Sequence, residues 1–202
     1  INVRDKFQFR RFMELIASLT GEELIYDNIA KIIGIDKKTV MSWLSVLIAG
    51  DIVYLLEPYN EISISKRIIK RPKLYFTDTG LACYLARLNS GEILGASAFS
   101  GRFVETYIIN EIKKSYVNNG IEPNFYYYRD SDMNEIDLVI IQDGKLHRIE
   151  CKSGIKFNNN AVKGFKQLDK TNYQIGFKVI ICNTDTVYPL DDNVYVLPLA
   201  GI

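Results

Sequence analysis

Two apolar runs joined by a turn dipeptide constrain the fold of this chain more than any other feature. The runs are Ile136–Ile141 and Leu146–Cys151, and Asp143-Gly144 stands between them. Asp-Gly favours a two-residue type I′ turn, whose twist matches that of paired antiparallel strands. The segment therefore predicts a β-hairpin, and with it a fold that contains a sheet.

The register of this hairpin follows from the turn. Pairing Gln142 with Lys145 brings Asp137 directly opposite Glu150. Because side chains alternate along a strand, we expect one face to carry core residues and the other to end in charged residues. The expected charged face comprises Glu135, Asp137, Val139, Ile141, Leu146, Arg148, Glu150 and Lys152, and the expected core face comprises Ile136, Leu138, Ile140, His147, Ile149 and Cys151.

Two carboxylates that face each other across a strand pair have a chemical implication. Like charges directly opposite each other destabilise the pair, so Asp137 and Glu150 suggest a divalent cation between them. Oxygen ligands with room for water suit Mg²⁺ or Mn²⁺. The alternative is a surface cluster in which Lys152 forms salt bridges with the acids. Glu135 is expected at the rim rather than as a ligand.

The rest of residues 97–202 predicts an α/β domain with a mixed sheet. Apolar residues at helical spacing mark Phe103–Lys114, and a second helix is expected over Ala161–Asp169. Besides the hairpin, strands are expected at Phe125–Tyr128, Phe177–Cys182 and Val194–Leu197.

Residues 1–90 predict a mostly helical domain, which a small, turn-rich stretch near residues 89–100 separates from the second. A helix pair joined by a tight turn and followed by a β-ribbon is typical of a winged helix-turn-helix. Helices are expected at Phe7–Leu19, Asn28–Ile33 with Asp27 as its cap, Lys37 to about Ala49 with Asp36 as its cap, and from Asp78 or Thr79 to Leu88, and strands at Ile52–Leu56 and Lys73–Phe76.

The composition excludes several classes of protein. The net charge is +1, so any contact with nucleic acid must be local. The single histidine excludes His-rich metal centres. The three cysteines form no Cys-x-x-Cys pair, so the sequence supports neither a zinc ribbon nor a disulfide framework. No GxxxxGK[ST] sequence occurs, so the chain has no phosphate-binding loop of the ATPase type. The longest uncharged apolar run, Thr39–Gly50, is too short for a membrane span, and no signal peptide opens the sequence. The scattered, unpaired cysteines lead us to expect a reducing, cytoplasmic location, and we expect no contact with the membrane. Since the chain begins at Ile1, we expect it to be a piece of a longer protein.

Two resemblances rest on particular residues. Asp137 followed by Glu150-Cys151-Lys152, with Glu105 as an upstream acidic helix residue, resembles the PD-(D/E)XK nuclease superfamily, which implies a restriction-endonuclease-like architecture for residues 97–202. A longer ordered set resembles the uncharacterised module found C-terminal to AAA+-type ATPase domains in bacterial and archaeal proteins. That set is Arg71–Leu81, Phe103-Val104-Glu105, Tyr128-Arg129-Asp130, Asn134–Asp137, Ile149–Lys152 and Val194–Pro198.

The resemblance implies a metal-dependent nuclease, a hydrolase of phosphodiester bonds, that acts with an upstream AAA+-type ATPase domain. Asp137, Glu150 and the backbone carbonyl of Cys151 would hold Mg²⁺ or Mn²⁺, and Glu105 would bind it directly or through water. Lys152 would orient or help deprotonate the attacking water. The alternative is a catalytically silent module of an ATPase that recognises DNA or protein.

Two basic segments predict contact with nucleic acid, for which we expect DNA. Lys37 and Lys38 lie on the outward face of the expected third helix, where they can enter a major groove. In the expected ribbon, Lys66, Arg67, Lys70 and Arg71 would neutralise phosphates and make binding depend on salt. The alternative is a winged helix that packs against an ATPase domain or another protomer. For the role of Glu105, the alternative residue is Glu111 on the same helix.

Overall fold

Contacts within the chain divide it into two units. The computed structural model describes residues 6–60, 71–155, 157, 159–191 and 193–202, with only the backbone at 159 and 160. Ile1–Leu55 and Arg71–Thr106 form the first unit, and Leu56–Lys70 and Tyr107–Ile202 form the second. The division falls C-terminal to the predicted boundary near residues 89–100. The domain limits 1–90 and 97–202 stay a prediction.

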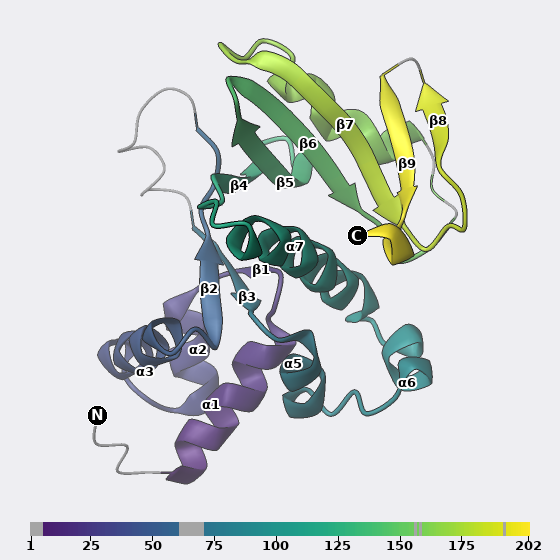
Figure 1. The fold of residues 1–202 in the computed structure, drawn as a ribbon. Helices are drawn as coiled ribbons and strands as arrows, with labels where there is room; N and C mark the ends of the chain where they lie inside the picture. Colours follow the sequence, from purple (N-terminus) through teal and green to yellow (C-terminus); the bar gives the residue numbers. More distant parts are fainter. Residues whose placement is uncertain (1–5, 61–70, 156, 158, 192) are drawn as a thin grey trace. The chain divides into compact units, whose positions relative to one another are not determined.

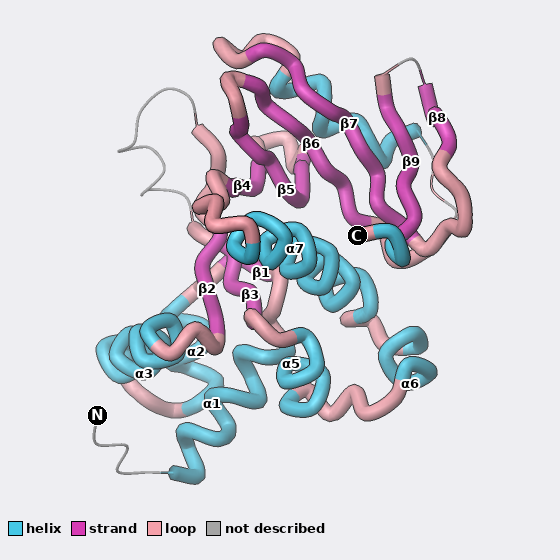
Figure 2. Tube along the Cα trace, viewed as in Figure 1, coloured by secondary structure: helices cyan, strands magenta, loops and turns pink. Residues whose placement is uncertain are grey.

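Helices make up most of the first unit (Figures 1 and 2). They are α1 (Lys6–Ser18), α2 (Tyr26–Ile33), α3 (Lys37–Ala49), α5 (Thr79–Leu85) and α6 (Gly91–Ala96). Asp36 caps α3 as predicted, since its Oδ1 accepts a hydrogen bond from the Thr39 N–H at 2.9 Å. The predicted cap of α2 is wrong: Ile25 is the N-cap, and Asp27 lies inside the first turn, where the helix dipole favours an acid.

A short sheet completes the described part of the first unit. Its strands β1 (Glu22–Glu23), β3 (Lys73–Phe76) and β2 (Val53–Leu56) lie in the order β1-β3-β2. Trp43 of α3 is buried and makes edge contacts with Phe9 and Phe12 at centroid distances of 5.2 and 5.4 Å. It is therefore a core residue. Because residues 61–70 lie outside the described residues, the winged-helix detail stays a prediction.

The second unit is built on a mixed six-stranded sheet among its described residues, which confirms the predicted α+β class. The strand order is β4-β5-β6-β7-β9-β8; β7 runs parallel to β6 and β9, and the other pairs are antiparallel. Strand β8 was not predicted, because it is short and contains Pro189, as edge strands can. The strands are β4 (Phe125–Arg129), β5 (Glu135–Gln142), β6 (Lys145–Cys151), β7 (Gln174–Cys182), β8 (Tyr188–Asp191) and β9 (Val194–Pro198).

Helical segments accompany this sheet. Helix α7 (Ser100–Asn118), within which the first unit ends at Thr106, is longer than predicted, and η1 (Asn159–Leu168) is a 3₁₀ helix rather than an α-helix. Phe165 and Leu168 of η1 share a core cluster with buried sheet residues, among them Val139, Leu146, Ile180 and Val196. A Cβ added to Gly164 would lie 2.0 Å from the Glu135 carbonyl oxygen. Glycine therefore lets η1 approach β5 closely. A second 3₁₀ turn, η2 (Leu199–Gly201), ends the chain.

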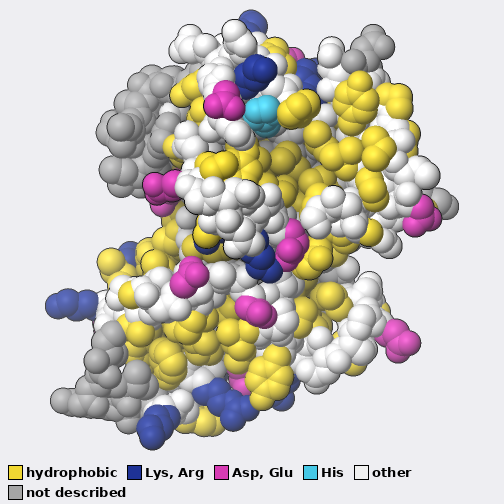
Figure 3. All heavy atoms as spheres, in the orientation of Figure 1, with side chains coloured by type: hydrophobic (Ala, Val, Ile, Leu, Met, Phe, Trp, Pro, Cys, Tyr) yellow, Lys and Arg dark blue, Asp and Glu magenta, His cyan; other side chains and the backbone are white. Residues whose placement is uncertain are grey.

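One region of the sheet is not buried. Figure 3 shows hydrophobic side chains gathered over β7 and β9. Phe177 of β7 is 70% exposed and Tyr195 of β9 is 49% exposed. His147 is only half-buried and its ring packs on that of Phe177 at 5.1 Å. The residues of the predicted core face are therefore buried except for His147.

Candidate functional site

The hairpin that carries the candidate site has the predicted turn, and its register is the predicted one up to, but not including, the expected pair Asp137–Glu150. Asp143 and Gly144 have positive φ angles of 50° and 73°, as a type I′ turn requires. Gln142 pairs with Lys145, and the same register continues to Leu138 opposite Ile149. The turn dipeptide alone was enough to place these pairs.

The strict alternation expected along β5 is wrong near Asp137. On the other side of β5, Tyr126 pairs with Val139 but Tyr128 pairs with Ile136. Two residues of β5 therefore stand opposite one residue of β4, which is a β-bulge. Because cross-strand partners share a face, the bulge places Ile136 on the same face as Val139, and both belong to one core cluster.

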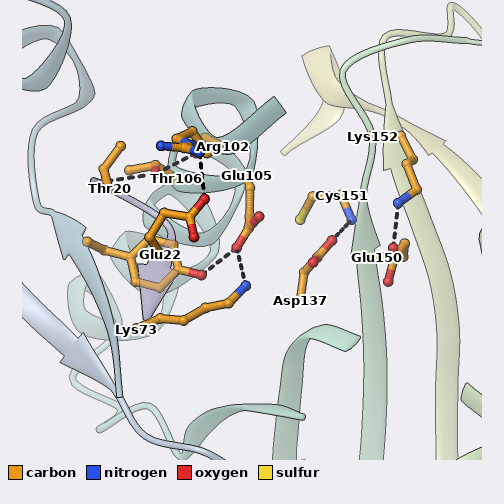
Figure 4. Close-up of polar contacts among 11 residues, drawn as sticks. Thr20, Glu22, Lys73, Arg102, Glu105, Thr106, Asp137, Glu150, Cys151 and Lys152 are labelled. Carbon is orange, nitrogen blue, oxygen red and sulfur yellow. Dashed lines mark hydrogen bonds and ion pairs between the residues drawn. The ribbon is translucent and has the colours of Figure 1, made fainter. Parts of the chain in front are cut away.

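The bulge coincides with the end of the β5–β6 ladder. The Lys152 N–H donates to the Ile181 carbonyl on β7, so the preceding N–H, that of Cys151, points towards β5. There it donates to Oδ2 of Asp137 at 2.7 Å (Figure 4), whereas a continued ladder would give it to the Ile136 carbonyl. The carboxylate of Asp137 thus replaces a backbone carbonyl as the acceptor, and its hydrogen bond to the Cys151 N–H fixes its position beside β6.

Glu150 is a buried carboxylate in an unfavourable environment. Its residue is 7% exposed, and burial together with the nearby charge of Asp137 raises its pKa to about 8. Glu135 adds a smaller effect in the same direction. One oxygen, Oε1, accepts from Lys152 Nζ at 2.5 Å, but Oε2 has no hydrogen-bond partner among the described residues. A buried oxygen without a partner is costly unless something else binds it.

Lys152 completes the group that the hairpin brings together (Figure 4). Burial alone would lower the pKa of its ammonium, but the charges of Glu150 and Asp137 outweigh this effect and raise it. Lys152 therefore stays cationic beside the two acids. Its side chain is 33% exposed, so it forms the solvent-facing edge of the cluster.

Glu105 belongs to the first unit, unlike Asp137, Glu150 and Lys152. Its Oε1 accepts from Lys73 Nζ at 3.0 Å and from the Tyr75 hydroxyl at 2.5 Å. Both Lys73 and Glu105 have largely buried side chains, so this is a buried ion pair. The alternative residue, Glu111, pairs with Lys114 on the surface of α7 at 2.7 Å. A role for Glu105 at the metal stays a prediction.

The hairpin site offers a small set of oxygen atoms that could bind a metal ion. Asp137 and Glu150 supply carboxylates, and the expected third donor is the backbone carbonyl of Cys151. Within the described residues, no group of three or more His, Cys, Asp or Glu side chains could hold a metal ion. A cation here would therefore keep several waters, as Mg²⁺ usually does when one or two carboxylates bind it.

The residues predicted to contact nucleic acid are only partly described. Lys37 and Lys38 are exposed as expected, although Lys37 is 2.9 Å from the Asp27 carboxylate. Arg71 is also exposed. Lys73, two residues beyond Arg71, is buried and paired with Glu105, so its charge is not available to phosphate. Lys66, Arg67 and Lys70 lie outside the described residues.

The structure also reveals a charged network that the sequence analysis missed. Arg148, expected on the charged face of the hairpin, is fully buried and donates to the Phe165 carbonyl and to Asp169 Oδ1. Lys178 lies beside it on β7, 3.2 Å from the same Asp169 oxygen. Arg148 lies between two aliphatic residues, Leu146 and Ile149, that are buried in the structure. This position in an apolar stretch was the sequence signal that could have predicted the burial of Arg148.

No helix in the described ranges combines the length and apolar character needed to cross a bilayer.

Comparison with known proteins gives distant relatives. The chain is 22% identical over 189 residues to the uncharacterized protein Rv2008c of Mycobacterium tuberculosis and, equally, to Mb2031c of Mycobacterium bovis. These matches cover 94% of this chain and 41% of each relative, so the chain spans about two fifths of their length. The crystal structure of protein VC1899 from Vibrio cholerae aligns with 97% of this chain and 54% of its own at 13% identity, with a TM-score of 0.29.

Two family models match the chain. The domain of unknown function DUF8612 matches residues 1–92, within the helical part of the chain. The domain of unknown function DUF4143 matches residues 100–202, just over half of the chain, and includes the whole of the hairpin site. The chain therefore belongs to the DUF4143 family.

Proposed function

We propose that the second unit is a metal-dependent nuclease-like module that hydrolyses phosphodiester bonds, with DNA as the substrate. One observation carries the proposal: Glu150 is buried beside Asp137 and keeps one carboxylate oxygen without a partner among the described residues. Its pKa of about 8 means that ionising it at neutral pH costs free energy. A divalent cation would remove that cost.

The donor set fits a hard cation. Asp137 and Glu150 offer oxygen ligands only, and a backbone carbonyl at Cys151 would add a third oxygen. Mg²⁺ and Mn²⁺ prefer such ligands and tolerate coordination completed by water. When bound, the cation would lower the pKa of a bound water and stabilise negative charge on the phosphate oxygens.

The chain's own residues would have separate roles. The Cys151 N–H holds Asp137 in place, so that carboxylate is preorganised. Lys152 retains its proton because the neighbouring acids raise its pKa. We therefore assign Lys152 the role of orienting the attacking water and stabilising negative charge, rather than that of a general base.

The proposed partners are an upstream AAA+-type ATPase domain and DNA. The curated relatives are more than twice as long as this chain, which leaves room for a further domain in proteins of that kind. In the first unit, the exposed residues Lys37, Lys38 and Arg71 would contact phosphates. That unit would then supply DNA binding and the second unit the chemistry.

One observation favours a second candidate, a catalytically silent recognition module. Lys152 already neutralises part of the charge of Glu150, and the described side chains offer only two acids at this place. A salt-bridged cluster could then bind nucleic acid or protein without a metal. The two candidates differ in their dependence on Mg²⁺ or Mn²⁺.

The test is a cleavage assay with the 202-residue chain on labelled duplex and single-stranded DNA, with Mg²⁺, Mn²⁺ or EDTA. We expect metal-dependent cleavage that falls by about 100-fold or more in Asp137→Asn, Glu150→Gln and Lys152→Met. Glu122→Gln, an exposed carboxylate outside the site, is the matched control. Cleavage in EDTA, or site variants as active as the control, would refute the nuclease. DNA binding without cleavage in either metal would favour the silent module.

A further inference from the structure

A cleft in the first unit lies between α1 and α5, two helices that contact each other and run side by side (Figure 1). Its volume is about 270 Å³, slightly below the about 300–1,000 Å³ of sites that enclose a small molecule. A cleft of this size would hold one part of an extended ligand. Its lining comprises Arg10 and Glu14 of α1, Tyr84 and Leu85 of α5, and Arg87 and Asn89, which follow α5.

Two arginines in this cleft share one carboxylate. Glu14 Oε1 lies 3.4 Å from Nε of Arg10 and 3.6 Å from Nη2 of Arg87. The two arginine side chains are 70% and 78% exposed, so most of each remains open to a ligand. Glu14 therefore holds two guanidinium groups near each other and neutralises one of them. Lys6 and Arg11 are also exposed and extend the positive surface along α1. Such a surface favours phosphate groups, which guanidinium groups bind through charge-assisted hydrogen bonds.

Exposed aromatic rings accompany these cations. Tyr84 lines the cleft and is 66% exposed. Phe7 is 70% exposed and lies on the same face of α1 as Arg10 and Glu14, because residues three, four and seven apart share a helix face. These are the two most exposed of the large apolar side chains described in the first unit. Both rings therefore offer surface on which a flat group can stack.

The backbone of Arg87 supplies an independent observation. Helix α5 ends in a Schellman motif, in which the Leu88 N–H donates to the Cys83 carbonyl at 2.9 Å and the Arg87 N–H donates to the Tyr84 carbonyl at 3.1 Å. This motif gives Arg87 a φ of 61°, in the left-handed region that favours glycine. Strained backbone of this kind clusters at functional sites. The function that fits an exposed arginine beside a second one is anion binding.

We propose that this cleft and the adjoining face of α1 bind a single-stranded nucleic acid. Phosphates contact Arg10 and Arg87, and bases stack on Tyr84 and Phe7. Proteins that bind single strands combine cations along the phosphate backbone with rings on which bases stack, and this surface has both. A duplex would use only the cations, because its bases are stacked on one another.

This surface is distinct from the contacts assigned to the first unit in the proposed function, which are Lys37, Lys38 and Arg71. The inference rests on the charges and rings of α1 and α5 and does not require a metal at the hairpin. It can therefore be tested by binding alone.

The test is fluorescence anisotropy of the 202-residue chain with a labelled oligodeoxythymidine of about 15 nucleotides, and with its duplex, in EDTA at several salt concentrations. Tyr84→Ala removes a stacking ring, and Tyr84→Phe keeps it. Arg87→Gly removes a cation and relieves the left-handed strain. Lys31→Gln, an exposed lysine of α2 that does not line the cleft, is the control. Thermal unfolding of each variant reports on the fold.

We expect Tyr84→Ala to weaken the single strand by about tenfold, the loss of one stacked base, and to leave the duplex unchanged, whereas Tyr84→Phe keeps both affinities. Arg87→Gly should weaken the single strand by about tenfold and reduce the slope of log affinity against log salt by about 0.7. Its unfolding temperature should not fall, so the lost affinity cannot come from lost structure. Lys31→Gln should bind as the original chain does.

Three results would overturn the proposal: no binding of the single strand, equal losses in Tyr84→Ala and Tyr84→Phe, or unchanged affinity in Arg87→Gly. Duplex binding that is lost in Lys37→Gln but retained in the Tyr84 and Arg87 variants, together with any of these results, would leave the proposed function standing and remove only this surface.

Discussion

Replacing Glu150 by glutamine should stabilise the metal-free protein at alkaline pH. The carboxylate has an ordinary pKa of 4.5 and a pKa of about 8 in the folded chain, because burial and the charge of Asp137 disfavour ionisation. Between these values the folded state binds more protons than the unfolded state, so the free energy of unfolding falls as pH rises. Below pH 4.5 both states are protonated, and the penalty is absent.

The size of the effect follows from the same interval. About 3.5 pH units at about 1.4 kcal/mol per unit correspond to a penalty of about 5 kcal/mol above pH 8. This is large beside a typical stability of about 5–15 kcal/mol. Glutamine has nearly the same shape and no charge, and its carbonyl can still accept from Lys152, so Glu150→Gln should recover most of the penalty.

Urea unfolding in EDTA at several pH values between 4.5 and 8.5 measures this effect. We expect Glu150→Gln to exceed the original chain by several kcal/mol at pH 8.5 and to converge with it at pH 4.5, whereas Glu122→Gln should show no such trend. Added Mg²⁺ should stabilise the original chain at pH 8.5 but not Glu150→Gln. A constant difference across the pH range would refute the assignment of a buried, uncompensated carboxylate.

Three further predictions concern the scaffold of the second unit. Gly164→Ala should cost about 3 kcal/mol in urea unfolding because a Cβ there meets a backbone carbonyl of β5, whereas Gly154→Ala, with open space around it, should be nearly neutral. Asp169→Asn should cost about 2–3 kcal/mol by the same measurement, because it leaves the buried Arg148 guanidinium without its carboxylate. The single histidine, His147, should be the neutral Nε2–H tautomer with a pKa below 6.5 in an NMR titration, because it is partly buried and its Nδ1 accepts from a backbone N–H of β7.

Local chemistry predicted several features of this fold directly. The Asp143-Gly144 turn sets the hairpin register, because few other residues adopt positive φ at both positions. Gly34 ends α2 in a left-handed conformation, and Asp36 begins α3, for reasons that lie within a few residues. Such signals need no knowledge of distant parts of the chain.

Features that depend on distant residues could not be predicted in this way. The bulge at Asp137 arises from pairing with β4, which the periodicity of β5 does not encode. The burial of Lys73 depends on Glu105, thirty-two residues away. Arg148 was expected at the surface because its partner Asp169 lies outside the hairpin. The acids of the candidate site were found because one turn brings their strands together.

The central claim is that Asp137 and Glu150 share one divalent cation, and Mn²⁺ titration by isothermal calorimetry tests it directly. We expect one Mn²⁺ per chain, with affinity reduced at least about tenfold in both Asp137→Asn and Glu150→Gln and retained in Glu122→Gln. Absence of Mn²⁺ binding, or binding that survives both substitutions unchanged, would contradict the claim.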